Sequence, residues 1–346
     1  MKIAVVYSSK EGLLQEYQKY HRQSAKEIPA DFFAEGDSFE TIHAVMDAVR
    51  WGGHEVVGLE GNDQVASELE NSRPDLVFNM TEGLFGDFRE SYVPMICERL
   101  GLPYTGSDPL TLALCLNKAR TKEVLGFYAI TTPHFKVMAP GQQIELAGIQ
   151  FPAIIKPVAE GSSKGVFDNS VVENEAEALD RIEESFLKYN QAVLIEEFLT
   201  GSEFTVAIWG NGSEVEVLPI VALNYDQLPA GAKPIYSYEA KWIWDRPDAP
   251  LEIFACPAPI SKALREKIEL LVRRAYDVLA VRDWCRTDVR LDAQGNPHIL
   301  ELNPLPGILP KPEDNSCFPK AARTAGYSYE EMINHVIDIA SKRYGL

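Results

Sequence analysis

The 346-residue chain is short of paired cysteines, of basic charge and of long apolar runs, and each shortage excludes a class of protein. Its 33 Lys and Arg residues against 51 Asp and Glu give a formal charge of -18, which argues against a chain-wide affinity for nucleic acid or anionic membranes. No stretch approaches the roughly 18 apolar residues of a membrane span. The five cysteines are scattered without a C-x-x-C pair, so neither a disulfide framework nor a zinc knuckle is indicated. We expect a cytoplasmic protein with reduced thiols and without nucleic-acid or membrane partners, in which any phosphate chemistry is local.

The first hundred residues alternate short apolar runs with amphipathic patterns of helical period. The runs KIAVVY (2–7), HEVVGLE (54–60) and PDLVFN (74–79) predict buried strands. Strands that alternate with helices indicate βαβ units and a doubly wound parallel sheet, which makes this an α/β domain. Ligands bind such sheets at the carboxyl ends of the strands, here near residues 8–12 and 79–87.

Residues 13–36 follow the first strand, and their weak periodicity predicts an insertion or a lid. The pattern is helical after them, with apolar residues along one face. Asp37 and Glu40 have the spacing of a capping box, so we expect this helix to begin at Asp37.

From about residue 127 the pattern changes to strands such as FPAIIKP, AVLIEEFL, EFTVAIWG and EVEVLPIVALN, which predict an α+β region. Residues 224–250 are rich in Pro, Gly, Tyr and Trp without a clear period, and a loop of that length and composition favours a lid. We therefore predict three domains, which cover residues 1–108, 109–197 and 198–346.

The segment KPVAEGSSKG (156–165) is the sharpest local motif, because a buried strand ends in Lys-Pro and continues into a loop of small residues. Its glycines let the backbone approach a phosphate closely, Ser162 and Ser163 add hydroxyl donors, and Lys156 adds a charge. It matches neither a Walker A motif nor a dinucleotide fingerprint. Taken alone, the segment is equally compatible with an ordinary hairpin turn.

A second motif joins RTDVRLD (286–292) to HILELNP (298–304) through a short turn. The strand period of two places Arg286 and Asp288 on one face, and the partner strand presents Glu301 and Asn303 together. Two carboxylates and an amide are hard oxygen ligands suited to Mg²⁺. The alternative is a solvent-facing hairpin of alternating charges.

Six motifs in order, LNKARTK, KPVAEGSSKG, LIEEFLTGSEFTVAI, YEAKW, CRTDVRLD and LELNPLPG, carry a family resemblance. From about residue 74 to its end, the chain resembles ATP-grasp enzymes, and most closely the D-alanine–D-alanine ligases. The resemblance implies an ATP-grasp fold, a homodimer, and ATP with two Mg²⁺ ions, which Mn²⁺ could replace.

The resemblance also implies roles for single residues. The metal ligands would be Asp288, Glu301 and Asn303, and the catalytic residues Arg286, Ser162, Lys241 and Gly307. Contacts to ATP would come from Lys118, Lys156, Ser162, Ser163, Glu196, Glu197, Phe198, Leu199, Glu203 and Lys241.

The substrate half departs from the ligase pattern. Residues 79–83 read NMTEG where such ligases carry a His-Gly pair, and the segment after Gly307 is longer than usual. Glu11 is the candidate for the first substrate's ammonium group, and Glu82 is a substrate candidate in the segment that corresponds to the pair near the second substrate. Trp242 takes the place of a lid tyrosine or phenylalanine, and Ser316 matches the serine that holds the acceptor's carboxylate. Trp242 could instead be lid packing, and Glu82 a surface carboxylate.

The expected activity is that of an ATP- and Mg²⁺-dependent carboxylate–amine ligase that joins an amino acid to an amino acid or a small metabolite through an acyl phosphate. One alternative is a natural-product ligase with a non-peptide acceptor such as a mycosporine. A non-catalytic nucleotide-binding protein and a small-molecule kinase on the same fold are the others.

Overall fold

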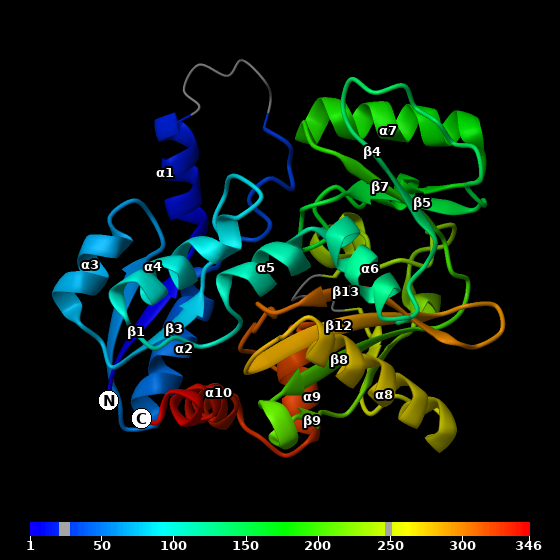
Figure 1. Cartoon of the computed structure of the whole chain (residues 1–346). Helices are drawn as coiled ribbons and strands as arrows, with labels where there is room; N and C mark the ends of the chain where they lie inside the picture. The colour runs from blue at the N-terminus through cyan, green and yellow to red at the C-terminus, as the bar shows by residue number, and fades with distance from the viewer. Residues whose placement is uncertain (21–27, 246–250) are drawn as a thin grey trace.

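The computed structural model describes residues 1–20, 28–245 and 251–346. Figure 1 shows three sheets in chain order, the first with blue and cyan helices, the second below α7, and the third crossed by α8. Among these residues no helix is long and apolar enough to cross a membrane. All five cysteines are free thiols.

The first sheet is parallel with strand order β2-β1-β3, and helices cover both of its faces, as the sequence predicts. Ile3 and Val5 of β1 pack with α2 and α10, whereas Ala4 and Val6 pack with α3 and α4. The elements of this part are β1 (Lys2–Tyr7), α1 (Lys10–Tyr20), α2 (Phe39–Trp51), β2 (Glu55–Glu60), α3 (Val65–Ser72), β3 (Leu76–Met80), η1 (Arg89–Ser91) and α4 (Tyr92–Leu100).

The start of α2 corrects one expectation. Ser38, not Asp37, is the N-cap, and its hydroxyl accepts a hydrogen bond from the backbone N–H of Thr41. Asp37 instead lies beside a cavity, as described below. Of the segment 13–36, which was expected to be an insertion or a lid, residues 13–20 belong to α1, and residues 21–27 lie outside the part of the chain that the structure describes.

The strands of the two further sheets pair in an antiparallel manner, and helices connect some of them, in agreement with the predicted α+β region. Two helices lead into them, and Asn117 separates one helix from the next: α5 (Pro109–Leu116) and α6 (Lys118–Phe127). The four-stranded sheet has the order β4-β7-β5-β6. Its elements are β4 (Phe135–Met138), β5 (Ala153–Pro157), η2 (Asp168–Ser170), β6 (Val171–Val172), α7 (Glu175–Tyr189) and β7 (Val193–Glu197).

The six-stranded sheet has the order β11-β10-β8-β12-β13, with β9 paired to β8. Its elements are β8 (Glu203–Trp209), η3 (Gly212–Glu214), β9 (Glu216–Val217), β10 (Val221–Leu223), η4 (Tyr225–Gln227), η5 (Ala240–Trp244), β11 (Phe254–Ala255), α8 (Lys262–Val278), β12 (Trp284–Leu291), β13 (Pro297–Asn303), α9 (Cys317–Thr324) and α10 (Tyr329–Tyr344). The strands of the first sheet come before residue 108, those of the second lie between residues 109 and 197, and those of the third follow residue 197. The division into domains at these positions stays a prediction.

The last helix closes the core of the first sheet. Met332, Ile333 and Val336 of α10 belong to the same apolar cluster as Ile3 and Val45. Asn334 donates a hydrogen bond of 2.7 Å to the carbonyl of Ala48 in α2. The N-terminal sheet therefore depends on the C-terminal helix for one of its two covered faces (Figure 1).

Candidate active site

A cavity of about 320 Å³ lies where the three sheets meet. All but one of the residues that the sequence singles out line it. These are Glu82, Lys118, Lys156, Ser162, Ser163, Glu196, Glu197, Phe198, Leu199, Glu203, Lys241, Trp242, Arg286, Asp288, Glu301, Asn303, Gly307 and Ser316. The cavity has two ends. The hairpin end comprises Lys118, Lys156, Glu196, Arg286, Asp288, Glu301 and Asn303, and the N-terminal end comprises Glu35, Asp37, Glu82 and Glu90.

The hairpin of β12 and β13 brings together the carboxylates and the amide that the strand period groups by face. Asp288 lies opposite Glu301 and Arg286 opposite Asn303, with a β-bulge directly after Asp288. The Asn303 amide nitrogen donates to Glu301 at 3.4 Å, which leaves the amide oxygen for another partner. Two carboxylates and an amide oxygen on one cavity wall fit Mg²⁺, which prefers such hard ligands.

Cations balance these carboxylates. Arg286 Nη2 lies 3.1 Å from Asp288 and 3.7 Å from Glu301, and Lys118 Nζ lies 3.3 Å from Glu301. Burial raises the pKa of Asp288 to about 6, with Arg286 opposing and Glu301 adding to the rise. Burial alone would raise the pKa of Glu301. The positive charges of Lys118, Lys156 and Arg286 outweigh burial and hold that pKa well below its usual value. Glu301 is thus ionised throughout the physiological range.

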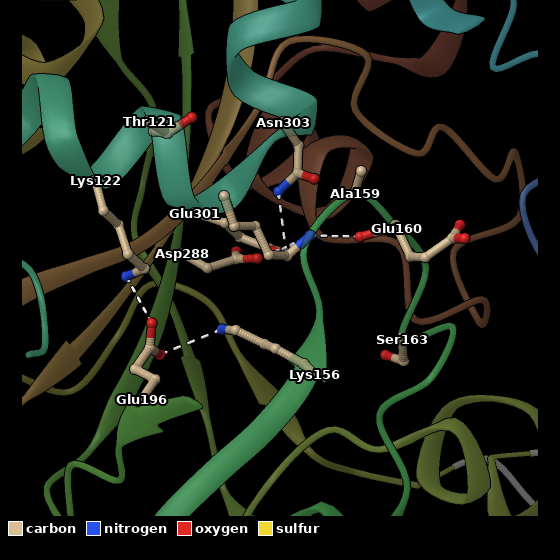
Figure 2. A network of polar contacts seen from close by, with 12 residues as sticks. Thr121, Lys122, Lys156, Ala159, Glu160, Ser163, Glu196, Asp288, Glu301 and Asn303 are labelled. Atoms are coloured by element: carbon tan, nitrogen blue, oxygen red, sulfur yellow. Dashed lines mark hydrogen bonds and ion pairs between the residues drawn. The ribbon is translucent and has the colours of Figure 1, made fainter. Parts of the chain in front are cut away.

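A buried carboxylate between two lysines lies next to this hairpin. Figure 2 shows Lys122 and Lys156 reaching Glu196 from two sides, at 2.7 and 3.2 Å. Burial lowers the pKa of Lys122 to about 8, although Glu196 opposes this. The Glu196 carboxylate is only 2% exposed and is occupied by these lysines, so it fixes the position of Lys156.

The loop after β5 has an unusual backbone. Ser162 and Ser163 have φ of 50° and 61°, in the left-handed region that non-glycine residues seldom adopt. Two contacts to the lid segment hold them: Trp242 Nε1 donates to the Ser162 carbonyl at 3.3 Å, and Ser163 Oγ donates to the Tyr236 carbonyl at 2.8 Å. Trp242 therefore packs on the loop and also lines the cavity.

Lys241 brings a further cation to the cavity from the π-helical turn η5. Burial, and next the neighbouring Arg286, lower the pKa of Lys241 to about 8. Its Nζ lies 5.2 Å from the centre of the Trp242 ring. This lysine can lose its proton under mildly alkaline conditions.

Ser316 and Gly307 are joined across the loop that follows β13. Ser316 Oγ donates to the Gly307 carbonyl at 2.9 Å and accepts from the Leu309 N–H at 3.2 Å. These bonds fold the segment after Gly307 against the cavity, which Ile308 and Leu309 also line.

The N-terminal end is rich in carboxylates. Oxygens of Glu35, Glu82 and Glu90 all lie within 4.8 Å of one another. Arg89 packs behind them and pairs with Glu35 at 2.7 Å and Glu90 at 3.3 Å. Burial raises the pKa of Glu90 to about 7, and burial with the nearby Glu90 and Glu35 raises that of Glu82 well above its usual value. Glu82 is therefore not a solvated surface carboxylate.

Asp37 completes this end of the cavity. Burial, and next the charge of Glu60, raise its pKa to about 8. One of its oxygens is buried without a hydrogen-bond partner among the described residues. Several carboxylates at this end thus hold protons near neutral pH.

Glu11 is the one candidate that does not line the cavity. The loop after β1 is short, so Glu11 falls in the first turn of α1 and is exposed. The carboxylate that enters the cavity from this region is Glu35, which the sequence did not single out.

Other residues of the site escaped prediction as well. Lys122 pairs with Glu196 behind the cavity wall, and it had a usable signal, because it lies four residues after Lys118 on one helix face. Glu35 and Glu90 belong to no motif, and Asp37 was assigned only to a helix cap; the three come to one cavity only through the fold.

Known proteins resemble this chain over most of its length. A family model described as D-ala D-ala ligase C-terminus matches residues 123–338. The chain is 32% identical to the D-alanine–D-alanine ligase of Actinobacillus succinogenes, over 86% of this chain and 91% of that protein. It is also 32% identical to the uncharacterized protein y4sG of Sinorhizobium fredii, over 99% of this chain and 98% of that one.

The fold has counterparts among solved structures. The D-alanine–D-alanine ligase from Bacillus anthracis complexed with ATP matches with a TM-score of 0.74 at 19% identity, covering 100% of this chain and 99% of that chain. Fold and cavity define an ATP-grasp enzyme. The chain belongs to the D-alanine–D-alanine ligase family and is an ATP-dependent ligase that forms a carbon–nitrogen bond.

Proposed function

We propose that this enzyme joins the carboxylate of an amino acid to the amine of a second amino acid or small metabolite, with ATP and two Mg²⁺ ions. One observation carries the proposal: a single cavity holds Lys118, Lys156, Lys241 and Arg286 opposite the oxygen ligands of the β12–β13 hairpin. That combination suits a polyphosphate bound with metal ions.

The reaction has two steps. An oxygen of the substrate carboxylate bonds to the γ-phosphorus of ATP as the bond to the ADP oxygen breaks, which gives an acyl phosphate and ADP. The amine then bonds to the acyl carbon, loses a proton, and phosphate leaves.

The side chains of the hairpin end stabilise the charge that develops on the phosphoryl oxygens. Arg286 is held between Asp288 and Glu301 and offers fixed donors, and Lys156 is held by Glu196. Asp288, Glu301 and Asn303 would hold Mg²⁺, which supplies further charge neutralisation when bound. Trp242 and Tyr236 cover the loop at 162–163 and help to keep water from the acyl phosphate.

The N-terminal end favours an amino acid as the first substrate. Its carboxylates outnumber the single arginine behind them, so a ligand with an ammonium group would be matched there. The apolar residues Ile308 and Leu309, from the longer segment after Gly307, favour a non-peptide metabolite as a second acceptor class.

The test measures phosphate release with pairs of D- and L-amino acids and identifies the product by mass. We expect an amide product with at least one pair, and its loss in Lys156→Ala and Glu301→Gln. Lys262→Ala removes a lysine that is 89% exposed and should leave turnover unchanged. Absence of ADP and phosphate with every pair would refute the joining of two amino acids, and a stable phosphorylated product would indicate a kinase.

A further inference from the structure

The segment of residues 28–37, here called the strap, lies across the loop that follows β5. Asp31 Oδ2 accepts the backbone N–H of Gly165 at 2.7 Å, and Glu35 Oε1 accepts that of Gly161 at 2.8 Å. The two carboxylates therefore accept hydrogen bonds from the two ends of the loop, and Ser162 and Ser163 lie between these ends. Hydrogen bonds from N–H groups to ionised carboxylates are stronger than neutral ones.

These contacts belong to the interior of the protein. Asp31 is 0% exposed, and its Oδ2 also accepts the Tyr189 hydroxyl at 2.6 Å. The Glu35 side chain is 5% exposed and pairs with Arg89. A Cβ at Gly161 would lie 2.6 Å from Glu35 Oε1, so any other residue there would displace the Glu35 carboxylate.

These hydrogen bonds explain how the loop keeps its backbone conformation. Two consecutive serines in the left-handed region are strained, and such a conformation persists only where surrounding contacts enforce it. The strap fixes the residue before the pair and the second residue after it, and the lid segment fixes the serines themselves.

The strap also reaches the lid segment and the N-terminal end of the cavity. The Tyr238 hydroxyl donates to the Ala30 carbonyl at 3.1 Å. Through Arg89, Glu35 is connected to Glu90, so one side chain contacts both the loop and the carboxylate cluster.

We propose that Asp31 and Glu35 are positioning residues that hold the loop at 161–165 closed over the ATP phosphates. Through Glu35 the strap connects that closure to the N-terminal end, where the first substrate would bind; this rests on the proposed function. A loosened strap would weaken ATP binding and admit water to the acyl phosphate, so that phosphate would be released without an amide.

The experiment compares Asp31→Ala, Asp31→Asn and Glu35→Gln with the unaltered enzyme. It measures KM for ATP, kcat, and the ratio of phosphate released to amide formed. For Asp31→Ala we expect KM for ATP to rise about tenfold and the ratio to exceed one, because charge-assisted hydrogen bonds are lost. Asp31→Asn keeps an acceptor for Gly165 and should recover most of the loss.

The control is Ile28→Thr, which alters an exposed strap residue and should change neither quantity. If Asp31→Ala does not fold, as judged by circular dichroism, Glu35→Gln decides, because it keeps the side-chain volume and weakens the bond to Gly161. A folded Asp31→Ala or Glu35→Gln with unchanged KM and a ratio of one would overturn the inference while the proposed function stands. If the unaltered enzyme forms no amide, the proposed function fails, and this inference with it.

Discussion

At the hairpin end of the cavity each carboxylate of the β12–β13 hairpin has its own nearby cation. Behind the N-terminal end, by contrast, Arg89 pairs with both Glu35 and Glu90 and shares Glu160 with Lys164. The pKa values follow this difference. Glu301 is held ionised by the surrounding cations, whereas burial raises the pKa of Glu90 to about 7, that of Asp37 to about 8, and that of Glu82 well above its usual value. The comparison teaches that one cavity can contain an end where cations keep a carboxylate ionised and an end where carboxylates outnumber the cations paired with them.

The largest effect expected from this difference is on catalysis at the hairpin end. Arg286→Met should lower kcat by about 1,000-fold, because an arginine that stabilises a transferring phosphoryl group contributes at least that much. Steady-state phosphate release measures it. Arg282→Gln breaks only a half-exposed pair with Asp108 and should lie within twofold of the unaltered enzyme. Equal kcat values for the two variants would contradict a catalytic role for Arg286 at the hairpin end.

A second prediction concerns pH and Lys241. Because burial lowers its pKa to about 8, the lysine is charged below that pH and neutral above it. We expect kcat/KM for ATP to fall as pH rises through about 8, approaching tenfold per pH unit. Lys241→Arg should move the fall to higher pH, since arginine stays charged. A flat profile between pH 7 and 9.5 would contradict the assignment.

A third prediction concerns stability at the N-terminal end. Between about pH 4 and 8 Asp37 is protonated in the folded protein and ionised in the unfolded one, so the folded state binds more protons. The free energy of unfolding should therefore decrease as pH rises through this window, by at most about 1.4 kcal/mol per pH unit for one group. Urea denaturation at several pH values measures the slope. Asp37→Asn should flatten it, whereas Asp47→Asn, at an exposed position, should not.

The smallest effect is expected at Cys317, which lines the cavity. Burial raises its pKa to about 12 although Arg286 opposes the rise, so even beside cations the thiol stays protonated. Iodoacetamide at pH 7 should leave activity unchanged and add no label at Cys317 by mass spectrometry. Denatured protein, in which all five cysteines are accessible, is the control. Labelling with loss of activity would show that the cavity wall opens readily.

The two ends also differ in how far the sequence predicts them. The hairpin end could be foreseen because strand period places Arg286 and Asp288 on one face and Glu301 and Asn303 on one face of the partner strand, and because Lys156 and the small-residue loop are contiguous. The N-terminal end could not, because Glu35 and Glu90 come from separate segments and meet only when the chain folds.

The errors have physical reasons. Glu11 was placed by a motif position, but α1 begins at Lys10 and carries that side chain into solvent. Asp37 and Ser38 can each serve as an N-cap, and the geometry of α2 selects Ser38. The sequence predicts the α/β and α+β classes of the sheets because apolar periodicity is strong in their strands. No sequence pattern predicts that residues 28–37 pack against the loop after β5.

The packing of α10 against α2 has a consequence for biosynthesis. Ile3, Val5 and Val45 are translated long before α10, whose apolar side chains belong to the same core. At roughly 5–20 residues per second, the nascent N-terminal sheet and α2 must wait on the order of 15 to 60 seconds for α10. This core should therefore be completed only once α10 has been translated, and until then the apolar surface that α10 covers is available for chaperones to bind.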